Sequence, residues 1–174
     1  RDLNEARGFI ESLCKKLGVK EGELAIDVAC GRGRHAQVLA SQGLDTIGID
    51  LSPESISFAN QFSHEGLEFQ VANMLEPFDV PKANWVFNLF TSFGYFEDDT
   101  MHAHAILNMA GALKPGGKLV LDYLNAEKIA AQTPETQPLL DTTQMVLRLF
   151  DHIDNQTTDL GKESWVEPVL NYQS

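Results

Sequence analysis

Apolar positions along the first 125 residues follow a helical spacing in some segments and a strand spacing in others. Residues 4–17 place their apolar side chains on one helical face and end at Gly18, which predicts an amphipathic leading helix. Helical segments are also predicted after Gly33, from Ser52 to about Phe62, and from Asp98 or Asp99 to about Leu113. The predicted strands are Leu24 to Ala29, Asp45 to Asp50, Leu67 to Ala72, Ala83 to Phe90 and Lys118 to Leu124. This alternation is typical of an α/β protein with a parallel sheet.

Boundary residues support these elements. Ser52 is a predicted N-cap, Pro53 suits the first helical turn, and Glu54 compensates the helix dipole. The run Lys114-Pro115-Gly116-Gly117 predicts a turn into the fifth strand. Beyond Asn125 the pattern changes, and residues 144–153 and 157–166 flank Asp154-Asn155 like two strands of a hairpin.

The predicted fold is therefore a doubly wound, mostly parallel Rossmann-like sheet with helices on both faces, plus a C-terminal antiparallel β-hairpin. Residues 1–125 would form the core, and residues 126–174 a loop and hairpin extension or insert of the same domain. The 174 residues suffice for one domain with a sizeable core, and no Pro, Gly or Ser-rich linker divides them.

Charge narrows the range of partners. The chain has 13 basic and 25 acidic residues, a net charge of -12, which disfavours nucleic acid and anionic membranes. Two cysteines are too few for a disulfide framework, so a reducing cytoplasm is expected. Neither a membrane-spanning apolar run nor a signal pattern is found in the sequence. This composition favours a small molecule or another protein as the partner, and the oligomeric state is left open.

One motif indicates chemistry. Asp27-Val28-Ala29-Cys30-Gly31-Arg32-Gly33 follows the first strand, and Asp50 ends the second strand 19 residues after Gly31. Glycines allow a sharp turn and close approach to a ligand, the following helix presents free N–H groups, and an acid can accept ribose hydroxyls. Gly31-x-Gly33-x-x-Ala36 also fits the fingerprint of nicotinamide-dependent oxidoreductases, so the motif alone leaves that class open.

Three further features favour a different class. Asp27 stands four positions before Gly31, a Lys-Pro-Gly-Gly turn precedes the fifth strand, and residues 88–96 read NLFTSFGYF after the fourth strand. Over about residues 24–125 the sequence resembles the class I S-adenosylmethionine-dependent methyltransferases, and a small bacterial group of them that carries this segment. The resemblance implies methyl transfer from S-adenosylmethionine to a small-molecule acceptor.

The resemblance also implies roles for individual residues. Ala29, Gly31 and Gly33 would surround the methionine part of the cofactor, with Asp27 and Cys30 in the same cofactor-binding set. Asp50 would bind the ribose, Leu51 would pack on the adenine, and Asn73 and Met74 would line its edge. Asn73 departs from relatives with an acid at this position, although an amide can still donate and accept hydrogen bonds. Asn88 and Leu89 would lie beside the reacting methyl group.

The segment after the fourth strand is predicted to form the acceptor pocket, with Phe93 and Tyr95 as its named residues and Phe96 as a further apolar wall. No catalytic residue is assigned, because transfer from an activated sulfonium mainly requires alignment in a dry pocket. His102 and His104 point to different helix faces, so no metal site is predicted. His35 would either approach the cofactor or be solvated.

Two alternatives remain at this point. The chain could be a non-catalytic S-adenosylmethionine-binding domain or, with less support, an oxidoreductase. The hairpin could be an insert in a chain whose closing elements are absent, or it could form the antiparallel edge of the sheet. We favour the insert, because the segment is rich in polar residues and lacks the continuous apolar runs of a buried strand.

Overall fold

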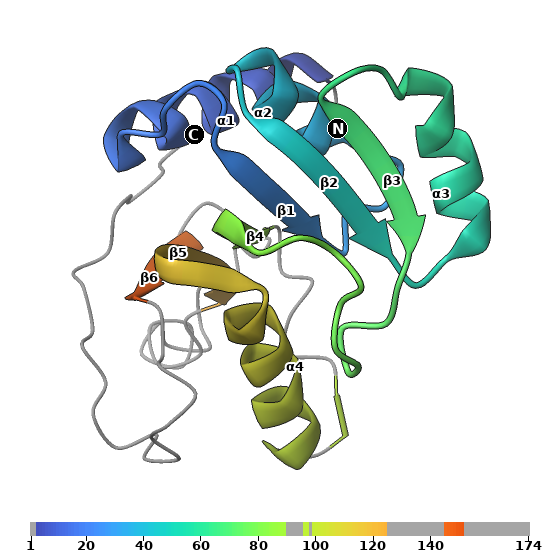
Figure 1. Cartoon of the computed structure of the whole chain (residues 1–174), viewed down its shortest axis with the longest axis vertical. Coiled ribbons are helices and arrows are strands. Elements are labelled where there is room, and N and C mark those ends of the chain that lie inside the picture. Colours follow the sequence, from blue (N-terminus) through green and yellow to red (C-terminus); the bar gives the residue numbers. More distant parts are fainter. Residues whose placement is uncertain (1–2, 90–95, 98, 125–144, 152–174) are drawn as a thin grey trace, which may run out of the picture.

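The computed structural model describes residues 3–89, 96–97, 99–124 and 145–151. Its centre is a six-stranded sheet with the order β3-β2-β1-β4-β5-β6 (Figure 1). The strands are β1 (Leu24–Val28), β2 (Asp45–Asp50), β3 (Leu67–Val71), β4 (Ala83–Asn88), β5 (Leu113–Leu124) and β6 (Met145–Asp151). The helices are α1 (Leu3–Leu17), α2 (Arg34–Ser41), α3 (Pro53–Ala59) with a following 3-10 turn (Asn60–Phe62), and α4 (Asp99–Gly111). The first five strands are parallel, which confirms the predicted mostly parallel sheet.

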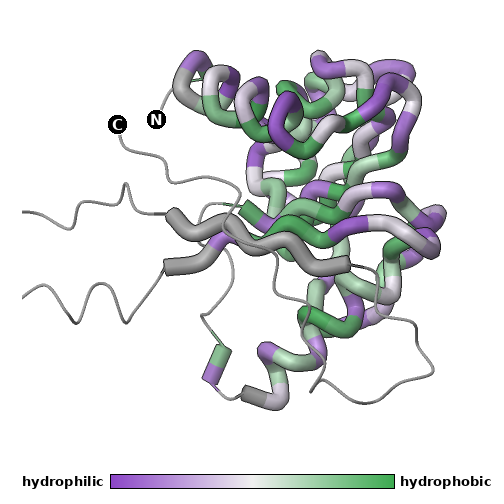
Figure 2. The backbone as a smooth tube through the Cα atoms, turned by 90° about the vertical axis from the view of Figure 1, so that its left-hand side faces the viewer, coloured by the Kyte–Doolittle hydropathy of each residue, from purple (hydrophilic) through white to green (hydrophobic). Residues whose placement is uncertain are grey.

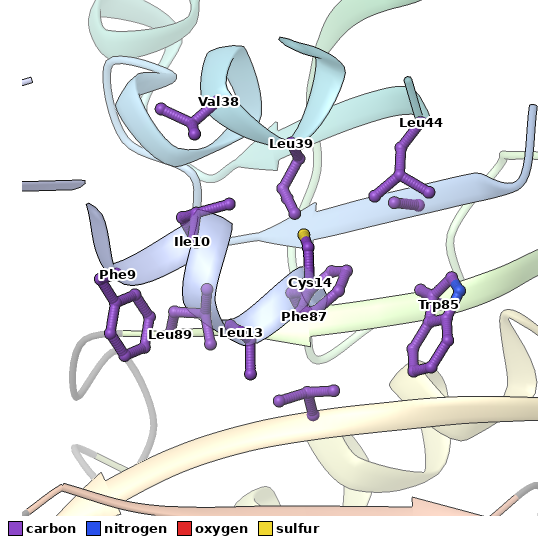
Figure 3. Packing of buried hydrophobic residues seen from close by; sticks show 12 residues of the cluster. Phe9, Ile10, Leu13, Cys14, Val38, Leu39, Leu44, Trp85, Phe87 and Leu89 are labelled. Atoms are coloured by element: carbon purple, nitrogen blue, oxygen red, sulfur yellow. The ribbon is translucent and has the colours of Figure 1, made fainter. Parts of the chain in front are cut away.

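Alternating residues of the strands send their side chains to opposite faces, and each face is covered by helices (Figure 1). On one face α1 and α2 pack against β1, β4 and β5, and Figure 3 shows Phe9, Ile10 and Leu13 of α1 in this cluster. On the other face α4 contributes Ala105 and Met109 to a second cluster. Figure 2 shows hydrophobic colouring concentrated in the strands of the sheet. The doubly wound architecture predicted from the sequence is therefore confirmed.

The predicted capping residues work locally as expected. The Ser52 hydroxyl accepts a hydrogen bond from the backbone N–H of Ser55 at 3.2 Å, and Pro53 occupies the first turn of α3. Glu54 lies in the same first turn, where a negative charge is favoured. The helix start that fixes the chain direction after β2 is thus encoded by three consecutive residues.

The strand order reverses next to β1, which is flanked by β2 on one side and by β4 on the other. Both neighbours are parallel to β1, so the carboxyl ends of all three strands lie at the same edge of the sheet. In an open α/β sheet, the connections leaving such a reversal point diverge to opposite faces and leave a crevice for a ligand. The glycine motif that follows β1 is therefore located where this fold binds ligands.

Two element boundaries differ from the predictions. β4 ends at Asn88 instead of near Phe90. β5 begins at Leu113, because Leu113 pairs with Ala83 before the register shifts between Ala83 and Trp85. Both differences concern strand ends, where pairing with a neighbour decides the boundary.

The C-terminal strand corrects a third expectation. β6 runs antiparallel to β5, with pairs from Lys118 and Asp151 to Leu124 and Met145. The first predicted hairpin segment thus forms the edge of the sheet, contrary to the favoured interpretation of an insert. Its predicted partner, residues 157–166, lies outside the described residues. The sequence of β6 is mainly apolar, and the polar residues that favoured an insert, Gln156 to Asp159, lie outside the described residues.

Candidate functional site

The turn between β1 and α2 is held by backbone hydrogen bonds. The N–H of Cys30 donates to the carbonyl of Ile49 at 2.9 Å, and the N–H of Gly33 donates to the carbonyl of Cys30 at 3.0 Å. Ala29 has a φ of 60°, and the described part of the chain has no other non-glycine residue with a positive φ. This conformation is costly for a residue with a Cβ and is found mainly where surrounding structure enforces it, often at functional sites. The turn is thus shaped for something other than local stability.

Asp50 connects the end of β2 to this turn. One carboxylate oxygen accepts a hydrogen bond from the N–H of Gly31 at 2.8 Å, and the other accepts from the N–H of Ser52 at 2.9 Å. Each carboxylate oxygen has two lone pairs, so both can still accept a hydrogen bond from a ligand. The structure therefore brings together the two residues that the 19-residue spacing singled out.

Two cavities open at this edge of the sheet and share Ala29. We call the first the β2–β3 cavity; it is lined by Val28, Ala29, Ile49, Asp50, Leu51, Ala72, Asn73, Met74 and Phe96. We call the second the α2 cavity; it is lined by Leu3, Ala29, Cys30, Gly31, Arg32, Arg34, His35, Gln37, Phe58, Phe62 and Leu89. The predicted adenine and ribose residues thus line one cavity, and most of the predicted methionine residues line the other.

Gly31 and Gly33 have different structural reasons for being glycine. A Cβ on Gly31 would meet no atom within 4 Å, and Gly31 lines the α2 cavity. A Cβ on Gly33 would lie 2.6 Å from the Phe69 ring, inside the core. Gly33 therefore lets α2 pack closely on β3, whereas Gly31 leaves room for a ligand. A cofactor contact by Gly33 stays a prediction.

Asp27 is buried beneath the turn, on the β1 face that α2 covers. Burial and then the charge of Asp50 raise its pKa to about 7, against a smaller lowering by a hydrogen bond from the backbone of Ala36. Its Oδ2 is buried without a hydrogen-bond partner. An unpaired buried carboxylate is costly, so this group holds a proton more readily than an ordinary aspartate does.

This burial predicts a pH-dependent stability. The pKa of Asp27 is about 7 in the folded chain and near the ordinary 3.8 when unfolded, so over this interval the folded state keeps a proton that the unfolded state has lost. Its contribution to the free energy of unfolding is therefore full below about pH 4 and is lost as the pH rises through about 7. Asp27→Asn should remove this contribution, so the variant should gain relative to the wild type as the pH rises.

Urea unfolding of both proteins from about pH 4 to about pH 8 measures the difference. Asp79→Asn, a change at an exposed acid, is the matched control and should give a nearly constant offset. A stability difference for Asp27→Asn that does not vary with pH would contradict the assignment.

Cys30 and His35 are both buried in the walls around the turn. Burial, followed by the charges of Asp27 and Asp50, raises the pKa of the Cys30 thiol, so it stays protonated. Burial and the neighbouring Arg34 lower the pKa of His35 to about 4, so its ring is neutral at pH 7. The interpretation of His35 as a solvated helix residue is wrong, since its side chain is buried and lines the α2 cavity.

Asn88 and Leu89 end the strand next to β1. The Asn88 Nδ2 donates to the Val28 carbonyl at 3.0 Å, while Oδ1 is buried without a hydrogen-bond partner. Leu89 is buried in the α1 cluster, where Figure 3 shows it near Phe9 and Leu13, and it also lines the α2 cavity. Both residues therefore lie at the end of the strand next to β1, and their place beside the reacting methyl group stays a prediction. Phe93 and Tyr95 lie outside the described residues.

The chain matches a known protein family over most of its length. A family model for the methyltransferase domain matches residues 19–166. The chain belongs to the methyltransferase domain family. This family agrees with the resemblance found in the sequence.

Individual relatives share this domain over part of their length. A ubiquinone biosynthesis O-methyltransferase of Alkalilimnicola ehrlichii is 30% identical over 130 residues, covering 71% of this chain and 50% of that protein. A tRNA U34 carboxymethyltransferase of Cellvibrio japonicus is 34% identical over 110 residues, 58% of this chain and 32% of that protein. The chain thus spans about half or less of these relatives.

Solved structures agree on the fold. A sugar N-methyltransferase of Streptoalloteichus has a TM-score of 0.60 at 25% identity, covering 86% of this chain and 60% of that one. An amino pentose methyltransferase of Micromonospora echinaspora, solved with S-adenosylmethionine bound, has a TM-score of 0.60 at 21% identity, covering 87% of this chain and 64% of that one. The methyltransferase domain therefore has the expected Rossmann-like core.

The residues present fit this cofactor. Gly31 leaves an open space beside the turn, and the Asp50 carboxylate, which accepts two backbone hydrogen bonds, keeps acceptor capacity in the wall of the β2–β3 cavity. The sequence interpretation did not include Val28, Ile49 and Ala72, which line the β2–β3 cavity at or just after strand ends. The predicted strand ends could have identified these residues, because parallel strands bind ligands at the edge of the sheet where their carboxyl ends lie.

Two further observations complete the description. Among the residues that the structure describes, no group of three or more His, Cys, Asp or Glu side chains is placed to hold a metal ion. Within the same ranges, no helix has both the length and the apolar character needed to cross a membrane.

Proposed function

We propose that this chain is the catalytic cofactor-binding part of an S-adenosylmethionine-dependent methyltransferase that acts on a small-molecule acceptor. The observation that carries the proposal is the Asp50 carboxylate, which lines the β2–β3 cavity and accepts hydrogen bonds from the N–H groups of Ser52 and of Gly31, a residue of the α2 cavity. A ribose with an adenine on one side and a methionine on the other matches this arrangement.

The two cavities divide the cofactor between them. Asp50 would accept hydrogen bonds from the ribose hydroxyls, and Leu51, Asn73 and Met74 would contact the adenine in the β2–β3 cavity. The backbone of Ala29, Cys30 and Gly31 would surround the methionine part in the α2 cavity, with Asp27 supporting the turn from below. The Asn73 Oδ1 already accepts the N–H of Leu75 at 3.0 Å, so its Nδ2 is the group that faces a ligand as a donor.

The chain contributes positioning to the reaction. When bound, S-adenosylmethionine supplies a methyl group on a sulfonium that needs no further activation by the protein. Asn88 and Leu89 would hold the acceptor side of the site, and Phe93 and Tyr95 are proposed to form the acceptor pocket. In-line transfer then requires a dry pocket in which the acceptor atom lies within about 3–3.5 Å of the methyl carbon. No residue is assigned as a general base.

A small molecule is the proposed acceptor because the chain carries a net charge of -12, which disfavours polyanions. The relatives include enzymes named for ubiquinone biosynthesis, amino sugars and tRNA, so the family alone does not select an acceptor. We also place the protein in a reducing cytoplasm, since Cys14 and Cys30 are both free and buried.

Asp50→Ala tests the proposed cofactor site. The variant should bind S-adenosylhomocysteine more weakly by about 1.5–3 kcal/mol, because it loses hydrogen bonds to a charged group. Asp45→Ala, at the opposite end of the same strand, is the matched control and should bind like the wild type. Calorimetric titration measures both affinities.

The same titration with NAD and NADP distinguishes the two classes that the glycine motif permits. The wild type should bind S-adenosylhomocysteine and show no comparable affinity for either nicotinamide cofactor. Tight NAD or NADP binding, or an unchanged S-adenosylhomocysteine affinity in Asp50→Ala, would refute the proposal.

A further inference from the structure

Phe96 lines the β2–β3 cavity. It follows β4 by eight residues, yet it lines the same cavity as Asp50, Leu51 and Asn73, which come from the ends of β2 and β3. Its side chain is half-buried and packs against the cluster under α4. One part of the ring is therefore anchored in the core while the residue faces the cavity.

We propose that Phe96 is an adenine-stacking residue of this methyltransferase, carried to the nucleoside end of the site by α4. The inference rests on the proposed function, because it assumes that the β2–β3 cavity holds the adenine. It assigns a role that differs from the acceptor wall expected for the segment after β4.

A ring contact with α4 orients Phe96. The ring meets His102, in the first turns of α4, edge to face, with centroids 5.2 Å apart and planes at 69°. Such an edge contact is a favourable aromatic geometry. In this geometry the two rings are not stacked face to face. The Phe96 ring is thus oriented by α4 before any ligand arrives.

A second contact ties α4 to the other side of the same cavity. The Nδ2 of Asn108 donates to the backbone carbonyl of Met74 at 3.1 Å. Met74 and Phe96 both line the cavity, and Asn108 and His102 lie on one helix. α4 therefore holds two walls of the cavity at a fixed distance from each other.

The residue types suit a purine. The side chains of Ile49, Leu51 and Met74 are apolar but have no π face, and Phe96 is the aromatic residue among the described residues that line this cavity. Stacking between a base and an aromatic ring contributes about 1–3 kcal/mol by alanine substitution. An aromatic ring at this position would recognise the adenine face, while Asn73 and Asp50 recognise its edge and the ribose.

Binding of two ligands to Phe96→Ala and Phe96→Leu tests the proposal. S-adenosylhomocysteine and 5′-methylthioadenosine share the adenosine but differ in the amino-acid part, so loss of an adenine contact should weaken both by the same factor. We expect roughly 5- to 100-fold weaker binding of each ligand to Phe96→Ala and a smaller loss for Phe96→Leu. Phe78→Leu, a change at a half-buried aromatic residue that packs on the same cluster but lines neither cavity, is the control and should leave the binding of both ligands unchanged.

A second variant keeps the test independent of the stability of Phe96→Ala. In Phe96→Trp the indole would stack on the adenine, so saturating 5′-methylthioadenosine should quench the fluorescence of this added tryptophan. The wild type has two tryptophans of its own and is the reference, and it should not show this quenching. Quenching with the expected midpoint supports the proposal even if Phe96→Ala does not fold.

The outcomes separate this inference from the proposed function. If the wild type does not bind S-adenosylhomocysteine, the proposed function fails. If the wild type binds and Phe96→Ala binds both ligands within a factor of two of it, only the role of Phe96 is refuted. Weaker binding of S-adenosylhomocysteine alone, or no quenching in Phe96→Trp, would also refute adenine stacking.

Discussion

Gly31→Val is expected to lose S-adenosylhomocysteine binding by at least about 100-fold, which corresponds to more than about 2.7 kcal/mol. A Cβ at this position would point into open space, so the folded chain itself has room for a side chain. That space belongs to the α2 cavity, where the methionine part of the cofactor is proposed to lie. The valine would occupy the volume that the ligand needs, and calorimetry measures the loss.

The backbone at Gly31 adds a smaller, separable effect. Its φ of 55° is left-handed, and a residue with a Cβ pays about 1–2 kcal/mol there. Gly31→Ala carries most of this strain with a much smaller side chain, so it should lose stability like Gly31→Val but retain more of the binding. If Gly31→Val unfolds by circular dichroism, or binds like the wild type, the glycine does not serve the ligand in the way proposed.

Gly33→Ala should have the opposite phenotype, a loss of stability of about 2–4 kcal/mol. Its Cβ would lie 2.6 Å from the Phe69 ring and 3.2 Å from the Cβ of Ala59, and its φ of 80° adds backbone strain. Gly48 faces the same ring, with a would-be Cβ at 2.5 Å, so the ring has no free space on either side into which to move. Chemical denaturation measures the loss.

A compensating change provides the control for Gly33→Ala. Phe69→Leu removes the ring atoms that the new Cβ would meet, so the double variant should be less destabilised than the sum of the two single variants. Strict additivity would contradict the clash as the cause. The contrast between Gly31 and Gly33 then assigns one glycine to the ligand and the other to helix packing.

The sequence predicted the elements that depend on local signals. The N-cap at Ser52, the strand-turn-helix around Gly31 and the pairing of Gly31 with Asp50 all follow from residues that are close in sequence or spaced at one βαβ unit. The candidate site could also be located from the sequence, because a doubly wound sheet binds its ligand at the carboxyl ends of the strands where the strand order reverses.

Features that depend on tertiary packing were not predictable in the same way. Phe96 reaches the β2–β3 cavity through its contact with His102 and the position of α4, which the local pattern does not contain. The sequence did not decide whether His35 is solvated or near the cofactor, because the burial of a residue in the first turn of a helix depends on which other elements cover it. β6 joins the edge of the sheet through pairing with β5, a contact that the polar residues near it did not indicate.

Ala29 is the residue that the two cavities have in common, and this has a consequence for affinity. A molecule whose halves each fill one cavity gains from its own connectivity, because once one half is seated the other is present at an effective concentration on the order of millimolar or above. Adenosine and homocysteine offered as separate molecules lack this advantage and must each be ordered from solution at full entropic cost. S-adenosylhomocysteine, which we propose fills both cavities, should therefore bind more tightly than adenosine and homocysteine supplied as separate molecules.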